Sequence, residues 1–218
     1  NYDRSTNTSA DWSNWQVEKQ NTVLELSHYF SDNWRLRATY SYKTTDEDTE
    51  LFYVYGTPDK NTELGLTGYG SEYDLDDKHN LADLYIDGDF SLFGREHQLV
   101  FGVNYAKLDY TDSSLYDFTT GNGFPAMPDL NTWDGNTPMP TFADGLRGSD
   151  VTREQQAAYF TGRFSIVDDL HLIVGGRYND WQAEGESYEV DQQADYQQFI
   201  PYLGAVYNIT PELVAYAS

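Results

Sequence analysis

The chain has no cysteine, few basic residues and no long apolar run. Without cysteine it forms no disulfide, so its stability has to come from hydrogen bonding and packing. The absence of a run of about 18 apolar residues excludes a membrane-spanning helix. Only 13 Lys and Arg residues oppose 36 Asp and Glu residues, which gives a net charge of −23. Such a chain is unsuited to nucleic acid, because phosphate binding needs clustered Lys and Arg.

Alternating apolar and polar residues are abundant instead. From Trp34 to Tyr42 every second residue is apolar, whereas Arg35, Arg37 and Lys43 belong to the opposite set. Because successive side chains of a strand point to opposite faces, this pattern predicts a two-faced strand. Its length matches the roughly 9–11 residues that a tilted strand needs to cross a bilayer. Aromatic residues, with 19 Tyr, 11 Phe and 5 Trp, fit the aromatic girdles of such strands.

The connections between the expected strands differ in length. We expect eight strands, at residues 17–31, 34–45, 78–93, 97–111, 153–167, 170–184, 196–208 and 212–218. Short polar turns join them at one end, at residues 31–33, 94–96, 167–169 and 208–211. Long loops join them at the other end, at residues 45–77, 111–152 and 184–196. Short periplasmic turns and long extracellular loops are typical of outer-membrane barrels, so we predict an all-β fold of antiparallel up-and-down strands from part of a transmembrane β-barrel.

Charged residues suggest which face lines the lumen. Arg35 and Arg37 follow one short turn, and Asp87 and Asp89 precede the next. If their strands pair, these residues lie at one height on a polar wall, where opposite charges stabilise modestly. The segment 45–78 is strongly acidic, which indicates either a solvated loop or an acidic mouth that attracts cations. A Ca²⁺ site has less support, because no EF-hand spacing is present.

Motifs of catalysis are missing, whereas aromatic residues suited to binding are plentiful. The four His residues are scattered over separate strands, and neither a zinc-binding pair nor a GxSxG motif occurs. We therefore expect no enzyme activity. Tyr and Trp side chains in the loops suit a bulky ligand with flat parts, although packing within the loops explains them equally well. These loop residues are Tyr53, Tyr55, Tyr69, Tyr110, Tyr116, Phe118, Trp133 and Phe142.

Three segments near the C-terminal end carry a family resemblance. They are GGRYNDW at residues 175–181, FIPYLGAVYNITP at 199–211 and LVAYAS at 213–218. Together they resemble the middle of the barrel of TonB-dependent ferric-siderophore receptors. Asn179 stands where that family usually has Asp. The resemblance implies a barrel of about 22 strands with a plugged lumen, of which residues 1–218 would be an internal fragment without plug domain or TonB box.

The resemblance also implies ligand, partners and location. Iron would be carried as a siderophore chelate, with no covalently bound cofactor. The partners would be ferric siderophore, outer-membrane lipid and lipopolysaccharide, and the TonB complex acting through parts of the receptor outside this segment. The location would be the outer membrane of a Gram-negative bacterium. Loop and upper-lumen aromatic residues and Arg bind ligand in this family, which makes the best candidates here Trp181, Tyr159, Arg177, Tyr53, Tyr55 and Trp133.

Two other interpretations stay open from the residues alone. A complete eight-stranded membrane barrel with a structural or adhesive role would show the same alternation and would pair its first and last strands. A soluble β-sandwich that binds sugar through its aromatic residues would also alternate, with its apolar faces pointing inward.

Overall fold

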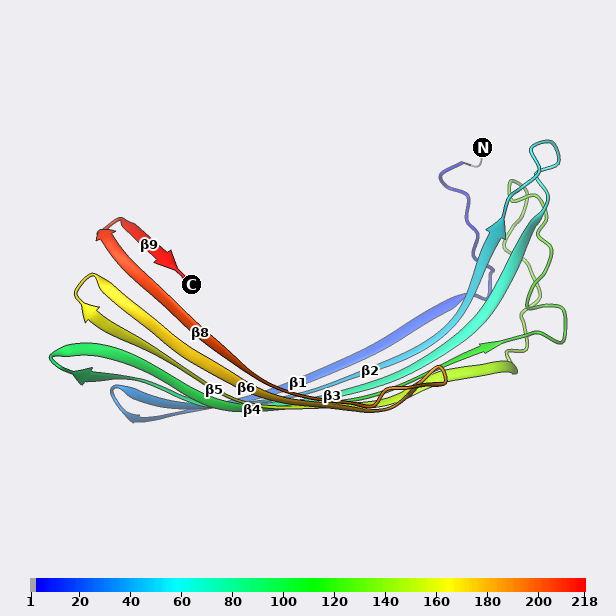
Figure 1. Cartoon of the computed structure of the whole chain (residues 1–218). Coiled ribbons are helices and arrows are strands. Elements are labelled where there is room, and N and C mark those ends of the chain that lie inside the picture. Colours follow the sequence, from blue (N-terminus) through cyan, green and yellow to red (C-terminus); the bar gives the residue numbers. More distant parts are fainter. Residues whose placement is uncertain (1–2) are drawn as a thin grey trace.

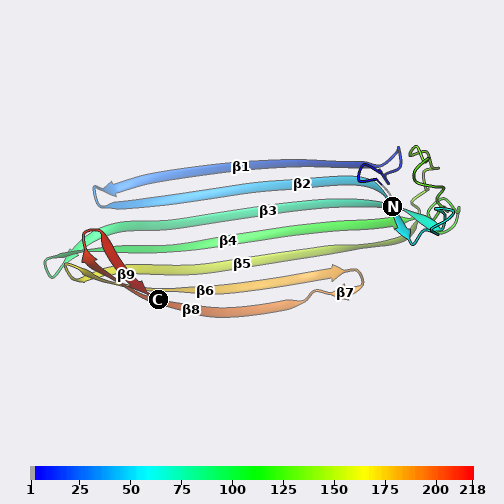
Figure 2. The same cartoon turned by 90° about the horizontal axis from the view of Figure 1, so that it is seen from above.

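The computed structural model describes residues 3–218, and it folds them into one curved antiparallel sheet (Figures 1 and 2). The strands follow the order β1-β2-β3-β4-β5-β6-β8-β9, and β7 pairs with β6 beside this path. Within residues 3–218, no helix is long and apolar enough to cross a membrane. The strand bounds are β1 Asn14–Ser31, β2 Trp34–Gly56, β3 Leu66–Leu92, β4 Arg95–Tyr116, β5 Asp144–Val167, β6 Leu170–Ser187, β7 Val190–Asp191, β8 Ala194–Thr210 and β9 Leu213–Ala217.

The fold class predicted from the sequence is confirmed, and so is the asymmetry of the connections. Tight turns join β1 to β2, β3 to β4, β5 to β6 and β8 to β9 at one end of the sheet. The longer connections lie at the opposite end, beside the N-terminal segment (Figure 2). The sheet is open among the described residues, because β1 and β9 lie at its two edges and do not pair. An open sheet of this kind is consistent with part of a barrel.

The strands extend much further toward the long connections than the sequence predicted. The expected loop at 45–77 is mostly strand, since β2 and β3 pair without interruption from Trp34 opposite Gly88 to Gly56 opposite Leu66. The expected loop at 184–196 contains the short strand β7, which raises the strand count from eight to nine. The prediction was wrong here because backbone hydrogen bonds continue through acidic residues that carry no apolar alternation. The longer loops that remain are 57–65 and 117–143, and two-residue connections at 188–189 and 192–193 flank β7.

The sheet has one apolar and one polar face. Residues directly opposite each other on neighbouring strands share a face. One such row joins Leu26, Ala38, Leu84, Val103 and Ala158 and is apolar throughout. The neighbouring row, one residue along each strand, carries Arg, Tyr and Gly. A one-residue shift in register would therefore exchange the two faces completely.

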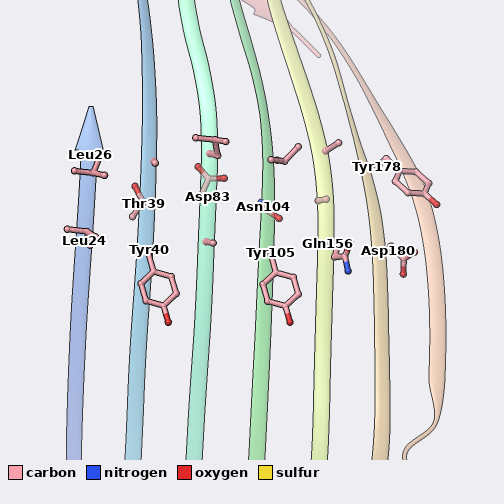
Figure 3. A pocket seen from close by; sticks show the side chains of 16 residues that line it. Leu24, Leu26, Thr39, Tyr40, Asp83, Asn104, Tyr105, Gln156, Tyr178 and Asp180 are labelled. Carbon is pink, nitrogen blue, oxygen red and sulfur yellow. The ribbon is translucent and has the colours of Figure 1, made fainter. Parts of the chain in front are cut away.

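A shallow hollow lies over the apolar face (Figure 3). Leu24, Leu26, Tyr40, Tyr105 and Tyr178 line it from four different strands. All five side chains lie on the same face as the row of Leu26 and Ala38, as the strand register shows. An exposed apolar surface of this extent is suited to contact with lipid chains.

A small hydrophobic cluster, here called the cap, closes the end of the sheet that bears the long loops. It joins strand ends to the 117–143 loop and to the N-terminal segment. Its buried members are Ala10, Phe52, Leu66, Met127 and Leu130. Trp12 packs edge-on against Phe52 with ring centroids 5.6 Å apart, and its indole Nε1 donates to the Thr137 carbonyl at 3.1 Å. The cap thus fixes the loop to β2 and β3.

We expect Phe52→Ala to loosen the cap. Phe52 is only 6% exposed, and truncation of a buried Phe costs about 3 kcal/mol or more. The expected result is faster protease cleavage within the 117–143 loop of the membrane-inserted protein. The control is Leu64→Ala, because Leu64 is 47% exposed in the neighbouring 57–65 loop. Equal cleavage rates in both variants would contradict a structural role for the cap.

Candidate ligand-binding site

A continuous polar row crosses the sheet on the face opposite to the apolar one. Arg37, Tyr85, Gly102, Tyr159 and Arg177 lie directly opposite one another on β2 to β6. The guanidinium carbon of Arg37 lies 5.9 Å from the ring centre of Tyr85, and that of Arg177 lies 5.9 Å from the ring centre of Tyr159. Cation–π attraction at this distance holds both Arg side chains against the neighbouring Tyr rings.

Hydrogen bonds extend this row into a network. The Tyr159 hydroxyl donates to Asp83 Oδ1 at 3.1 Å. The Arg177 side chain donates from Nε to Asn179 Oδ1 at 2.6 Å and from Nη2 to Asn104 Oδ1 at 3.2 Å. Asn179, the residue that departs from the family pattern, therefore orients Arg177. The network places a carboxylate, a phenol and a guanidinium side by side on one face.

The expected charge pairs form only in part. Arg35 and Asp87 pair as expected, through two hydrogen bonds of 3.1 and 3.0 Å. Asp89 lies opposite Gln98 on β4 instead of approaching Arg37. Within residues 3–218, neither Arg37 nor Arg177 forms a salt bridge with a carboxylate. Both therefore keep their positive charge available on the polar face of a strongly acidic chain.

Five aromatic rings, here called the aromatic row, lie near the loop-bearing end. Tyr69 is its centre, with ring centroids 6.1 Å from Tyr53, 5.6 Å from Tyr116 and 5.2 Å from Phe124. Phe118 completes the row, 5.6 Å from Tyr116 and 5.8 Å from Phe124. Tyr53 and Tyr69 are register partners in the same alternating set as Arg37 and Tyr85, so the row shares the polar face.

The loop contributes Phe124 by pairing with the free edge of β3. The Gly68 amide donates to the Pro125 carbonyl at 2.7 Å, and the Gly70 amide donates to the Gly123 carbonyl at 3.0 Å. The part of β3 that extends beyond the end of β4 therefore has hydrogen-bond partners for its backbone amides, as buried backbone groups require. Phe118, Phe124 and Tyr53 remain substantially exposed, which leaves ring surface for a ligand.

The structure brings some of the predicted site residues together. Tyr159 and Arg177 touch each other, and Trp181 follows on the same face of β6, opposite Gln155 and Tyr196. Tyr53 belongs to the aromatic row, and Tyr55 lies exposed beyond it at the end of β2.

Trp133 is placed elsewhere. Its ring lies 5.9 Å from Phe52 in the cap, and its Nε1 donates to the Asn136 carbonyl. Phe52 belongs to the apolar-face set of β2, so Trp133 packs on the other side of the sheet from Tyr53.

Sequence reasoning missed several members of this face. Tyr69, Tyr116 and Phe118 were recognised as loop aromatic residues but were not assigned to the site. Phe124 and Asp83 were not identified as site residues. The alternation of Asp83 with Ala82 and Leu84 was a usable signal for Asp83, because it marks the polar face. No local pattern marks Phe124, whose position depends on the loop.

The acidic segment lies mainly outside the polar face. Asp46 lies opposite Asp76 and Asp48 lies opposite Asp74, all in the alternating set of the apolar face. Glu47, between them, belongs to the polar face. In the part of the chain that the structure describes, no group of three or more His, Asp or Glu residues is arranged to hold a metal ion. The attraction of cations into a lumen stays a prediction.

The chain is similar to curated siderophore receptors. It is 30% identical over 218 residues to the ferripyoverdine receptor of Pseudomonas aeruginosa, covering 99% of this chain and 26% of that receptor. It is 31% identical over 231 residues to the ferric-pyoverdine BN7/BN8 receptor of Pseudomonas putida, covering 100% of this chain and 28% of that receptor. The chain thus spans about a quarter of the length of these relatives.

Solved structures show the same fold. The ferripyoverdine receptor of the outer membrane of Pseudomonas aeruginosa, bound to ferripyoverdine, superposes with a TM-score of 0.86 at 27% identity. That match covers 99% of this chain and 28% of the receptor. The ferric-catecholate import receptor of E. coli K12 in its closed form gives a TM-score of 0.74 at 14% identity, over 96% of this chain and 33% of that one. This second match concerns the fold alone.

Gly102→Ala is expected to disrupt the polar row. An added Cβ would lie 2.4 Å from Tyr159 Cζ and Oη and 2.8 Å from Tyr85 Cβ. The Tyr159 ring would have to move and lose Asp83, at a cost of about 1–3 kcal/mol for overpacking. The measurement is the denaturation midpoint of the full-length protein in detergent. The same substitution in a Tyr159→Ala background should cost less, and an unchanged midpoint for Gly102→Ala alone would contradict the close packing.

The two-faced sheet, its asymmetric connections and the similarity to receptors agree with the family comparison. The family model for the TonB dependent receptor-like β-barrel matches residues 1–218. Its members are receptors and transporters of the Gram-negative outer membrane and not enzymes. The chain therefore belongs to the family of TonB-dependent receptor β-barrels.

Proposed function

We propose that this chain is part of the barrel of a receptor that binds a ferric siderophore and imports it across the outer membrane with energy from the TonB complex. The observation that carries the proposal is the match of four ferric-pyoverdine receptors over 99–100% of the chain. These relatives also suggest the ligand class, a ferric chelate of the pyoverdine type. Iron enters as cargo within the chelate, and no covalently bound cofactor is part of the proposal.

The two faces of the sheet suggest which side chains would meet lipid and which would meet the lumen. The apolar rows would contact outer-membrane lipid and lipopolysaccharide, since barrel strands alternate lipid-facing and lumen-facing residues. The polar row and its network would then line the lumen. The tight turns would lie on the periplasmic side, and the aromatic row would lie at the extracellular entrance.

The aromatic row is the part of this face best suited to meet an incoming ligand. Exposed rings offer a large rigid surface at low entropic cost, and phenol groups add hydrogen bonds. Tyr53 and Tyr55 belong to this entrance region, whereas Tyr159, Arg177 and Trp181 lie deeper on the same face. Arg177 would contribute a positive charge there. Trp133 stays a predicted contact that nothing here supports, because its ring packs into the cap.

The relatives are about four times as long as this chain, so we propose that residues 1–218 form one part of a larger barrel. The TonB complex would act through parts of the receptor outside this segment. A family match supports neither the complete eight-stranded barrel nor the soluble sugar-binding sandwich. No observation of the site favours either alternative.

Transport can be tested in the source cell. Deletion of the gene that encodes the receptor should abolish uptake of radioactive iron supplied as ferripyoverdine, and the full-length gene should restore it. A second strain that lacks TonB function should show the same loss. Unchanged uptake of every ferripyoverdine offered to the deletion strain would overturn the proposed ligand class.

Tyr69→Ala should weaken binding of the ferric siderophore. Its ring contacts three other members of the aromatic row, so truncation removes a platform and loosens its neighbours. We expect a dissociation constant about tenfold higher, equivalent to about 1.4 kcal/mol. The matched control is Tyr40→Ala, because Tyr40 lies on the apolar face. Equal effects of the two substitutions, measured by equilibrium binding, would remove the aromatic row from the binding site.

A further inference from the structure

Asp117 forms an unusual concentration of hydrogen bonds where β4 ends and the 117–143 loop begins. The residue is 1% exposed. Its Oδ1 accepts the amides of Thr119 at 3.1 Å and Thr120 at 2.8 Å. Its Oδ2 accepts the Thr120 hydroxyl and, at 3.0 Å, the amide of Thr141. One carboxylate therefore joins the beginning of the loop to its end, 24 residues later.

A second carboxylate supports the adjoining residue. Asp144 Oδ2 accepts the Phe118 amide at 2.8 Å and the Thr119 hydroxyl at 3.0 Å. Asp144 thus holds the Phe118 amide, and the Asp117 carboxylate holds the two residues that follow Phe118. The Phe118 ring passes over Gly145, where an added Cβ would lie 2.7 Å from Phe118 Cε2.

The same anchor reaches the second loop ring of the aromatic row. At Gly123 an added Cβ would lie 2.0 Å from the carbonyl oxygen of Asp117, so the chain doubles back onto Asp117. The Gly123 carbonyl then accepts the Gly70 amide on β3. Phe124 follows directly and meets both Tyr69 and Phe118. Asp117 is therefore linked to both loop rings through short, fixed backbone segments.

We propose that Asp117 is the positioning residue of the ligand-binding face: it closes the 117–143 loop so that Phe118 and Phe124 complete the aromatic row. This inference rests on the proposed function, because it takes the aromatic row as a ligand platform. Asp117 itself is covered by the loop and does not touch the ligand. Its effect on binding passes through the two rings and reduces the ordering that the ligand would otherwise have to impose.

Ionisation keeps this closure intact at ordinary pH. The Thr120 hydroxyl, with the amides of Thr120 and Thr141, lowers the pKa of Asp117 from its ordinary 3.8 to about 2. Because the pKa is depressed in the folded state, the stabilisation is fully present above the unfolded value. It is lost only as the pH falls through about 2. The stabilisation by the Asp117 carboxylate is therefore fully present at neutral pH.

The first test is hydrogen exchange on the full-length receptor without ligand. Asp117→Ala should speed exchange of the amides of Thr119, Thr120 and Thr141 by about tenfold or more, since each loses its acceptor. The control is Asp134→Ala in the same loop, because Asp134 is exposed and, among residues 3–218, accepts only the Asn136 amide. Unchanged exchange in Asp117→Ala would overturn the closure.

The second test is a double-mutant cycle with ferripyoverdine as the probe. Asp117→Ala and the ring variant Phe118→Ala/Phe124→Ala should each raise the dissociation constant by about tenfold or more. If Asp117 acts by placing the two rings, adding Asp117→Ala to the ring variant should weaken binding little further. Additive losses, in which Asp117→Ala costs as much in the ring variant as in the wild type, would overturn the positioning role, because a merely structural residue would weaken binding independently of Phe118 and Phe124.

The two tests separate failure of this inference from failure of the proposed function. If the wild-type receptor binds no ferripyoverdine, the proposed ligand class falls, and hydrogen exchange still decides whether Asp117 closes the loop. If the wild type binds and Asp117→Ala binds equally well, the positioning role falls while the receptor function stands. Asp117→Asn provides a second variant, because its amide group retains only one of the two acceptor oxygens. Its hydrogen-exchange rates and its dissociation constant should lie between those of the wild type and of Asp117→Ala.

Discussion

The strict alternation of side chains along paired strands is the constraint on which the rest of this structure depends. Once β2 and β3 are in register, Ala38 and Leu84 share one face and Arg37 and Tyr85 share the other. The same register carries the apolar face to lipid and the polar network to the lumen in the proposed receptor. A slip of one residue would put Arg37 into lipid and Leu84 into water. Neither environment tolerates that exchange, so the register is strongly specified.

The two faces carry different structures at the loop-bearing end of the sheet, the cap on one and the aromatic row on the other. Beyond the apolar rows the strands carry acidic residues, and the cap around Phe52 shields their ends with Trp12 and Met127. On the polar face the same strand ends present Tyr53 and Tyr69. The 117–143 loop contributes to both, because Met127 and Leu130 enter the cap and Phe118 and Phe124 enter the aromatic row. Folding of the cap and assembly of the aromatic row are therefore coupled.

Much of the architecture could be predicted from the sequence. The span from Trp34 to Tyr42 predicted a two-faced strand, and the register with β3 confirms the two faces. The short turns predicted the end of the sheet at which neighbouring strands are joined tightly. Strand ends could not be placed, because the acidic part of β2 lacks apolar alternation. Backbone pairing with β3 is what extends it to Gly56. Arg177 and Tyr159 were predicted as ligand contacts from the family resemblance, and that prediction stays a prediction. Their contact with each other depends on the register of β5 and β6.

The sequence by itself determined that the strands have two faces and that short turns lie at one end of the sheet and longer connections at the other. It also determined the receptor family. These features follow from patterns within a few residues. Tertiary structure decided which aromatic residues meet. Trp133 and Phe124 belong to the same loop, yet one enters the cap and the other joins Tyr69. That division depends on how the loop backbone pairs with the edge of β3 and closes on Asp117. Such contacts join residues far apart in the chain and leave no local periodicity.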